Sequence, residues 1–235
     1  MNLTEYSEIS IGGEIMKSRI KLQGIIGLLV LFSLACNLSQ ISQLFGEYPT
    51  YPGGLLFQDG FSDPSSGWDR VRSLEGMTDY ENQRYRIVVN ASNADYWSNP
   101  GLYFEDVQVE VDALKNAGPD DNDYGVLCRY QDTENFYFLI ISSDGYYGIG
   151  IVVNGQQKLL EPPQMYHSEA ILTGNSINHL KAVCKGSRLA LTVNDEFIAE
   201  TYDSTFSTGD IGLIVGSFDE PGVDVLFDNL SVTLP

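Results

Sequence analysis

The segment NFYFLIISSDGYYGIGIVVNGQQKLL, from Asn135 to Leu160, decides the fold class of this chain. Its apolar runs are rich in Val, Ile, Tyr and Phe, the residues that fit the pleated surface of a β-sheet. Two dipeptides interrupt these runs, Asp144-Gly145 and Asn154-Gly155, and both favour the tight turns of β-hairpins. The segment therefore predicts three successive antiparallel strands.

The same pattern continues on both sides of this segment. Residues 107–114, VQVEVDAL, alternate valine with polar residues, which is the period-two pattern of a half-buried strand. Residues 178–203 predict a three-stranded meander, and no segment after residue 53 has a capped helical period of useful length. Evenly spaced strands with turn signals indicate a single all-β domain, a two-sheet sandwich or a barrel.

The N-terminal region carries a separate signal, GLLVLFSLACNLSQ, from Gly27 to Gln40. The apolar stretch over residues 24–35 is shorter than the roughly 20 residues that a membrane span needs. It fits the apolar region of a signal peptide behind Lys17, Arg19 and Lys21. We expect translation to start naturally at Met16, so that residues 1–15 are an upstream extension that the natural protein lacks. We expect residues 16–35 to be a signal peptide.

Cys36 directly follows this apolar region, after Ala35. The arrangement resembles the lipobox of bacterial lipoproteins, whose cysteine is lipidated and becomes the new N-terminus. Residues 36–53 would then be a lipid-attached cysteine and a flexible tether. The alternatives are ordinary signal cleavage with soluble secretion, and an uncleaved anchor. All three predict an extracytoplasmic protein, and the first predicts a cell-surface protein that contacts the membrane through its N-terminal lipid only.

The charge balance limits the partners of the exported part. The chain has 32 acidic and 13 basic residues and a formal net charge of −19. Residues 1–35 carry equal numbers of acids and bases, so the whole excess lies after them. Such a surface repels nucleic acid and anionic membranes, and it suits neutral ligands, cations or simply solubility. We therefore expect no nucleic-acid partner.

Two further cysteines, Cys128 and Cys184, lie in alternating segments that place both side chains toward the interior. In an exported protein a disulfide between them is the favoured interpretation. Two buried thiols that never meet are the alternative. We expect the two cysteines to lie on neighbouring strands.

Four stretches carry a resemblance to a known group: FQDGFSDPSSGW, DNDYGVLCRYQDTENFYFLIISSDGYYGI, LTVNDEFIAE and GLIVGSFDEPGVDVLFDNLSV. Together they resemble the concanavalin A-like lectin/glucanase superfamily, and they are most similar to laminin-G-like domains of bacterial surface lipoproteins, including the 3-keto-disaccharide hydrolase-like domains. The resemblance spans nearly all of a domain at residues 54–235. It implies a jelly-roll β-sandwich of two antiparallel sheets with about six or seven strands, adjacent first and last strands, and a concave face for a glycan.

Catalysis has weak support in the sequence. Glucanases of this superfamily carry carboxylates on alternate residues of one strand, and Glu110 and Asp112 begin such a pattern. The next residue on that face is Leu114, so the second catalytic carboxylate of a retaining mechanism is missing. We interpret the pair as the polar face of an amphipathic strand and name no catalytic residue; enzymatic activity is left open.

Binding of an extracellular glycan or a cell-surface polymer is the favoured function. Sugar sites combine aromatic rings with a few polar groups. Trp68 is expected to pack over one end of the sandwich instead. The residues predicted to contact a ligand are Tyr96, Trp97, Arg129, Tyr130, Asp144 and Tyr147.

Calcium is the one cofactor that the resemblance suggests. Jelly rolls of this group often carry a structural calcium ion between the terminal strands, and Asp228 and Asp59 are the candidate ligands here. The acidic loop PDDND, residues 119–123, is a second candidate without the spacing of a known calcium loop.

Three function classes therefore stand beside one another. The first is a non-catalytic surface domain that binds carbohydrate or another extracellular ligand. The second is a structural or adhesion module without a small-ligand site. The third is a glycan-active hydrolase of the 3-keto-disaccharide hydrolase-like type, which clustered carboxylates with perturbed pKa values in one cleft would favour.

Overall fold

The computed structural model describes residues 54–160 and 162–235. The predicted upstream extension, signal peptide, lipidated Cys36 and tether lie outside these residues, and so stay predictions. Within the described part every regular element is a β-strand, and none of its segments is a helix that could cross a membrane. The all-β prediction is confirmed for this part of the chain.

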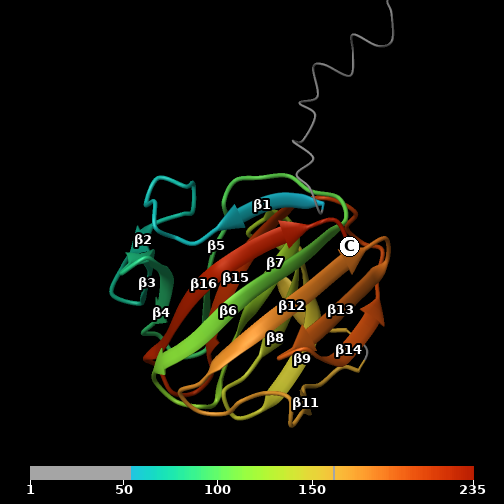
Figure 1. Cartoon of the computed structure of the whole chain (residues 1–235). Coiled ribbons are helices and arrows are strands. Elements are labelled where there is room, and N and C mark those ends of the chain that lie inside the picture. The colour runs from blue at the N-terminus through green and yellow to red at the C-terminus, as the bar shows by residue number, and fades with distance from the viewer. Residues whose placement is uncertain (1–53, 161) are drawn as a thin grey trace, which may run out of the picture. The chain divides into compact units, whose positions relative to one another are not determined.

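Sheet A forms the front layer in Figure 1, with strands β14, β13, β12, β6 and β16 side by side. The order continues through β4, β3 and β2, and β1 pairs with β16 beside this path. Its nine strands are β1 (Leu55–Asp59), β2 (Val71–Arg72), β3 (Gly76–Glu81), β4 (Arg84–Val89), β6 (Val107–Ala117), β12 (Ile177–Lys185), β13 (Arg188–Val193), β14 (Glu196–Tyr202) and β16 (Val223–Thr233).

Sheet B lies behind sheet A, and its strands run in the order β10, β9, β8, β7, β15 and β5, with β11 paired to the edge of β9. All pairings in both sheets are antiparallel. Its seven strands are β5 (Ala94–Ser98), β7 (Asn122–Asp132), β8 (Asn135–Ile141), β9 (Tyr146–Val153), β10 (Gln156–Leu159), β11 (Tyr166–His167) and β15 (Asp210–Ser217).

Strand β16 closes the sandwich. One of its edges pairs with β6, and the other pairs first with β4 and then with β1. A bulge at Asp228–Asn229, where Asn229 has φ +54°, shifts the alternation so that Leu230 and Val232 continue the buried row. The first and last strands are therefore adjacent, as expected. The predicted count of six or seven strands is wrong for sheet A, because β4 and β1 share one edge of β16 and the short β2 extends the sheet.

The hairpins predicted at the two dipeptides are present. Asn154 and Gly155 connect β9 to β10, and both have positive φ, +50° and +72°, as a two-residue type I′ turn requires. The connection between β8 and β9 contains Asp144 and Gly145. Strands β12, β13 and β14 form the predicted meander.

The core lies between the sheets and is filled by the alternate residues of each strand. Val107, Val109 and Val111 of β6 are fully or almost fully buried, as the alternation predicted. Trp68 is only 3% exposed and packs against Phe61 and Tyr85 at one end of the core, which agrees with its predicted packing role.

A disulfide joins Cys128 of β7 to Cys184 of β12. The predicted pairing is confirmed, but the two strands are not neighbours: β7 belongs to sheet B and β12 to sheet A. Both side chains point into the core from opposite sides, with their Cα atoms 6.7 Å apart. The bond therefore links the two layers of the sandwich.

We expect the double change Cys128→Ala and Cys184→Ala to lower the free energy of unfolding by about 2–4 kcal/mol, because it removes a link that restricts the unfolded chain. Urea denaturation of the Leu55–Pro235 domain measures this. Dithiothreitol should lower the midpoint of the wild type and leave that of the double variant unchanged. Equal midpoints for both proteins without reductant would contradict the prediction.

Candidate functional site

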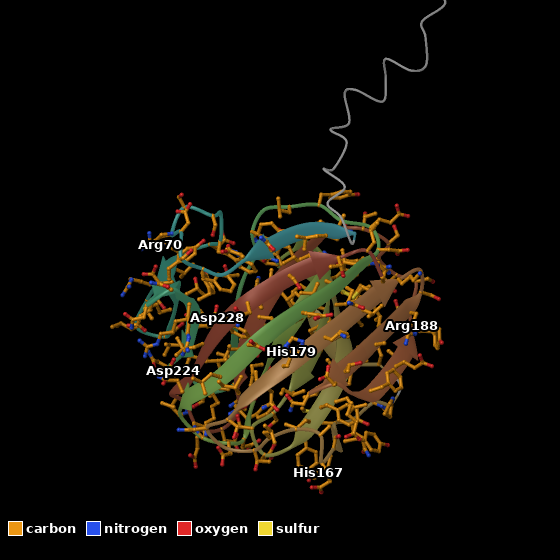
Figure 2. The ribbon with its side chains drawn as sticks, in the orientation of Figure 1. Arg70, His167, His179, Arg188, Asp224 and Asp228 are labelled. Carbon is orange, nitrogen blue, oxygen red and sulfur yellow. A yellow bond between two sulfur atoms is a disulfide. The ribbon has the colours of Figure 1, made fainter. Side chains whose placement is uncertain are left out.

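The outer face of sheet A is a network of ion pairs. His179 of β12 lies between two carboxylates of β6, with Nδ1 2.8 Å from Asp112 Oδ1 and Nε2 3.4 Å from Glu110 Oε2. Figure 2 shows His179, Asp224 and Arg188 distributed over this face. The carboxylates Glu110 and Asp112 are thus paired with neighbouring strands, which supports their interpretation as the polar face of a strand.

The outer face of sheet B is different, because it carries a second apolar cluster. On β7, Val126 and Cys128 belong to the core, whereas Leu127 points to the opposite side. The buried members of this outer cluster are Leu127, Phe136, Phe138, Ile140, Val152 and Ile214. Trp97 and Tyr130 are half-buried at its margin, so their rings are partly open to solvent.

A hollow of about 360 Å³ opens beside these two rings, and we call it the Trp97 hollow. It brings together Tyr96, Trp97 and Tyr130 from the predicted ligand residues. Four segments contribute to it: the chain before β2 with the start of that strand, β5, β7, and the turn between β7 and β8. Its lining is Asp69, Arg70, Val71, Asp95, Tyr96, Trp97, Tyr130 and Thr133.

Phe136 supports the two rings from below. Its ring centroid lies 5.4 Å from that of Trp97 and 5.6 Å from that of Tyr130, both at tilted angles. Such contacts between aromatic rings contribute beyond the area that they bury. Trp97 is also held in place by its strand, since β5 pairs with β15 with Trp97 opposite Ile214. The aromatic side of the hollow is therefore preorganised.

The opposite wall is held by hydrogen bonds to the main chain at Asp69. The carbonyl oxygen of Asp69 accepts from the hydroxyls of Thr78 at 3.0 Å and Ser98 at 3.2 Å, and from the hydroxyl of Tyr85. These donors come from β3, β5 and β4, so three strands position one peptide group. The side chain of Asp69 is left at the rim of the hollow.

Arg70 is held by a buried carboxylate. Asp79 accepts from Arg70 Nε at 2.6 Å and from Arg72 Nε at 2.9 Å. Burial acts to raise the pKa of Asp79, but the hydrogen bonds from both arginines outweigh it and leave this pKa below 3.8. The guanidinium group of Arg70 is thus fixed beside the hollow while remaining more than half exposed.

Tyr96 points to the other face of β5 from Trp97. Its ring lies against Gly76, where an added Cβ would be 2.6–2.7 Å from the ring atoms, and its hydroxyl is 2.9 Å from that of Ser73. Tyr96 therefore forms part of the wall and packs partly against the core. It contributes less open ring surface than Trp97 does.

Two carboxyl groups meet beside the hollow: Asp95 of β5, which lines it, and Asp123 of β7, which does not. The strand between them, β15, has Gly216 opposite both. A Cβ on Gly216 would lie 2.3 Å from Asp95 Oδ1 and 2.6 Å from Asp123 Oδ2, so the glycine leaves room for both groups. Burial raises the pKa of each acid, and the charge of Asp95 raises that of Asp123 further.

The other predicted ligand residues lie elsewhere. Arg129 sits at a bulge of β7 with φ +52°, and its side chain is 1% exposed. It donates to the carbonyl of Phe206 at 2.8 Å and contacts Asp106 at 3.2 Å. Arg129 is therefore directed away from the Trp97 hollow, because at the bulge its guanidinium group contacts Phe206 and Asp106.

Asp144 and Tyr147 lie away from the Trp97 hollow. Asp144 accepts a hydrogen bond from Ser142 in the connection between β8 and β9. Tyr147 packs against the core, whereas its neighbour Tyr146 is 41% exposed, as expected for alternate residues of a strand. Neither residue lines the same site as Trp97.

Asp59 and Asp228, the residues predicted to bind calcium, contact other groups of the protein in this structure, and calcium binding stays a prediction. The carboxylate of Asp59 accepts from Phe61 N at 2.7 Å, Ser66 Oγ at 2.5 Å and Trp68 Nε1 at 3.0 Å. Asp228 lies 3.6 Å from Arg84 Nε. Calcium takes about six to eight oxygen ligands, which include backbone carbonyls as well as carboxylates. Across residues 54–160 and 162–235 no group of three or more His, Cys, Asp or Glu side chains is placed to hold a metal ion.

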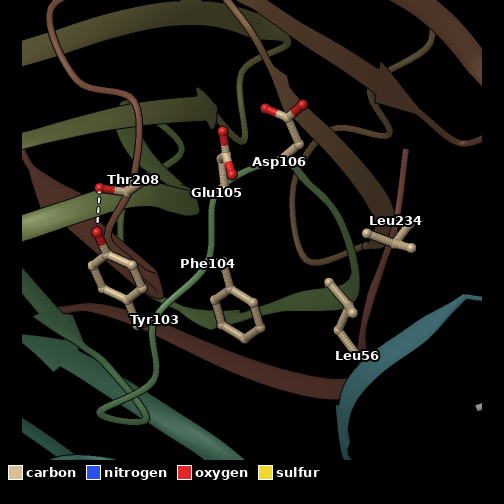
Figure 3. A pocket seen from close by; sticks show the side chains of 7 residues that line it. All are labelled: Leu56, Tyr103, Phe104, Glu105, Asp106, Thr208 and Leu234. Atoms are coloured by element: carbon tan, nitrogen blue, oxygen red, sulfur yellow. Dashed lines mark hydrogen bonds between the residues drawn. The ribbon is translucent and has the colours of Figure 1, made fainter. Parts of the chain in front are cut away.

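A larger hollow, of about 500 Å³, lies between the segment 103–106, before β6, and the paired ends of β1 and β16 (Figure 3). Apolar side chains of Leu56, Phe104 and Leu234 gather there, and Tyr103 donates to Thr208 at its edge at 2.6 Å. The carboxylate of Asp106 at its margin already accepts from Gly186 N. This hollow has fewer groups free to recognise a polar ligand, so the Trp97 hollow is the stronger candidate.

Comparison with solved structures places the domain among known sandwiches. It superposes on the carbohydrate-binding module CBM66 from Bacillus subtilis with a TM-score of 0.59 and 20% identity, covering 72% of this chain and 96% of that chain. The chain has the concanavalin A-like jelly-roll fold. The Bacillus licheniformis β-glucanase has the same jelly roll, with a TM-score of 0.56 and 10% identity over 79% of this chain and all 100% of that one.

A Bacillus subtilis protein described as having a galectin-like fold is also similar, with a TM-score of 0.58 and 12% identity over 77% of this chain and 96% of that chain. The sequence matches no protein-family model and no curated protein. At these identities the likeness establishes the jelly-roll fold.

Sequence reasoning missed the four charged residues in and beside the Trp97 hollow: Asp69, Arg70, Asp95 and Asp123. The sequence assigned Asp123 to an acidic loop, but it belongs to β7. The alternation of Asp95 with Tyr96 and Trp97 could have placed Asp95 on the same face as Trp97. Nothing in the sequence could have indicated that Asp123 lies two strands away on that face.

We expect Gly216→Ala to destabilise the domain by about 1–3 kcal/mol, because the new methyl group would displace the carboxyl groups of Asp95 and Asp123. Gly60→Ala is the matched control, since no atom lies within 4 Å of its Cβ position. Urea denaturation compares the two variants. Equal stability of both variants would show that the space above Gly216 is not closely filled.

Proposed function

We propose that this jelly roll is a non-catalytic carbohydrate-binding domain, exported and anchored to the cell surface by a lipid on Cys36. The observation that carries the proposal is the Trp97 hollow, in which two half-exposed aromatic rings lie beside carboxylates and an arginine. Its volume of about 360 Å³ falls within the range of small-ligand sites, roughly 300–1,000 Å³.

The chemistry of the lining suits a sugar ring. The C–H face of a pyranose or furanose is apolar and packs on an aromatic ring, here Trp97 or Tyr130. Sugar hydroxyls donate to the carboxylates of Asp69 and Asp95, and the guanidinium group of Arg70 donates to ring or hydroxyl oxygens. Because these groups come from separate segments that buried contacts hold in place, little conformational entropy is lost on binding.

The structural neighbours support a role with carbohydrates. One is a carbohydrate-binding module and another is a β-glucanase. A further one is described as an endo-acting O-glycanase for mucin breakdown, with a TM-score of 0.55 and 10% identity over 77% of this chain and 99% of that chain. Because one fold hosts many functions, the proposal depends on the hollow and not on this likeness.

Hydrolysis is the second candidate, and the raised pKa values of Asp95 and Asp123 favour it. A glycosidase needs two carboxyl groups that both reach the scissile bond. Asp123 is only 5% exposed and lies outside the lining of the hollow. It can therefore act only through Asp95, and this arrangement favours binding over hydrolysis.

The export part of the proposal has independent support. A disulfide between Cys128 and Cys184 is expected in oxidising compartments outside the cytoplasm. Growth in labelled palmitate followed by purification tests the lipid: incorporation that Cys36→Ser abolishes supports it, and a mature protein without label contradicts it.

We expect Trp97→Ala to weaken glycan binding at least about tenfold, equal to about 1.4 kcal/mol, because the main apolar surface for the sugar is lost. The measurement is a glycan array with the Leu55–Pro235 domain, followed by calorimetry with mixed-linkage β-glucan or the strongest array ligand. Phe197→Ala is the control, since Phe197 is an exposed aromatic residue on β14 of the other sheet.

If the Trp97→Ala variant binds the glycan as tightly as the wild type does, the binding site does not include Trp97. If the wild type binds none of the plant, algal, bacterial and mucin glycans, either with calcium or with chelator, a structural or adhesion role is favoured. Release of reducing sugar by the wild type would favour the hydrolase.

A further inference from the structure

Asp95, which lines the Trp97 hollow, and its neighbour Asp123 form a close pair of acids. Asp95 and Asp123 lie on β5 and β7 and point to the same side of sheet B over Gly216. Oxygens of both groups lie within 2.7 Å of one point, the Cβ position of that glycine. They are therefore within about 5 Å of each other, close enough for each charge to disfavour the other.

Neither carboxyl group has a compensating partner among the described residues. No hydrogen bond or ion pair joins Asp95 or Asp123 to another side chain or to a backbone amide of residues 54–160 and 162–235. Buried acids normally accept several hydrogen bonds or pair with a base. Asp123 is nevertheless only 5% exposed, so an acid without a partner among the described residues is nearly buried, and it lies next to Asp95.

The charged groups around the pair supply no base to neutralise it. From the chain before β2, Asp69 and Arg70 face the hollow, and Arg70 is bound to Asp79. Tyr130 and Thr133 are further polar residues that line the hollow on this side. In the loops beyond the start of β7 and the end of β15 the charges are again acidic: Asp144, Asp219 and Glu220 lie close enough to raise the pKa of Asp121. Asp210 lies at the opposite end of β15, with its pKa raised to about 6, chiefly by burial.

The two acids differ in exposure, and this assigns their roles. Asp123 is enclosed, so a charge there has the larger desolvation cost. Asp95 lines the hollow and is partly exposed, so a charge there is better solvated. One proton shared by the pair therefore resides on Asp123, whose O–H can donate to Asp95.

Resting on the function proposed above, we propose that Asp123 is a protonated positioning residue that donates a hydrogen bond to Asp95, and that Asp95 is the oriented acceptor for a hydroxyl group of a neutral sugar. One oxygen of Asp95 is engaged by Asp123, and the other is presented to the hollow. The site then selects neutral glycans, because the carboxylate of a uronic or sialic acid would face Asp95 and Asp69.

The first experiment needs no ligand. Carbon-13 NMR of the Leu55–Pro235 domain labelled at aspartate carboxyl carbons follows each group with pH. We expect one carboxyl to remain protonated at pH 7 and its signal to disappear in Asp123→Asn. Asp195→Asn, at an exposed turn, is the matched control. Ionisation of every aspartate below about pH 5 would overturn the proposal.

Stability supplies a second measurement without ligand. A carboxyl group whose pKa is raised in the folded state keeps more protons folded than unfolded, so the free energy of unfolding falls as pH rises above the ordinary value of about 4. Asp123→Asn removes this loss. We expect the variant to become increasingly more stable than the wild type from pH 4 to pH 8, and parallel curves would contradict the shared proton.

Ligand binding tests the role of the pair. With mixed-linkage β-glucan or the strongest array ligand at pH 7, we expect Asp95→Asn to weaken binding at least tenfold. Asp123→Asn should retain the affinity, because its amide also donates to Asp95, whereas Asp123→Ala should weaken binding several-fold. Unchanged affinity of the Asp95 variant, together with loss of binding in Trp97→Ala, would overturn the assignment of Asp95 while leaving the proposed function intact.

A bound cation is the competing explanation for two close carboxylates. Calcium chloride titrated into the wild type and the Asp95→Asn variant distinguishes the two, with thermal unfolding as the readout. We expect no calcium-dependent difference between them. A rise in the unfolding temperature of the wild type that Asp95→Asn abolishes would overturn the shared proton and assign the pair to a cation. If no glycan binds at all, the proposed function fails, while the NMR titration still decides the protonation of the pair.

Discussion

The sandwich depends on strand β16 and its pairing with three others. β16 hydrogen bonds to β6 along one edge and to β4 and then β1 along the other, so both ends of the domain meet at one strand. The bulge at Asp228–Asn229 keeps its apolar residues on the inner side despite the change of partner. Without this strand the inner face of sheet A would have no continuous surface to bury against sheet B.

The two sheets use their outer faces for different purposes. Sheet A presents paired charges, which keep a broad surface soluble and contribute little to stability individually. Sheet B instead presents an apolar cluster with Trp97 and Tyr130 at its margin. Beside these rings lies the acid pair of Asp95 and Asp123, which destabilises the fold when both groups are charged. Destabilising arrangements of this kind are expected at functional sites, where residues are selected for function at the expense of stability.

Local patterns were sufficient for much of the fold. The turn at Asn154-Gly155 needs two residues with positive φ, and its flanking strands follow from their composition. The inward direction of Cys128 and Cys184 followed from alternation, but their location on facing sheets did not. Arg129 was misplaced because a bulge breaks the alternation within β7, and a bulge has no dependable signal in the sequence.

The sequence alone determined the all-β class, the hairpins, the buried rows and the aromatic residues that could bind a sugar, because each depends on neighbours within a few positions. Only the tertiary structure decided that Trp97 and Tyr130 share a hollow and that Asp95 meets Asp123 over Gly216. These encounters depend on the lateral order and register of β5, β15 and β7. The register is set by hydrogen bonds between segments far apart in the chain, so it cannot be predicted from the local pattern of residues in any one segment.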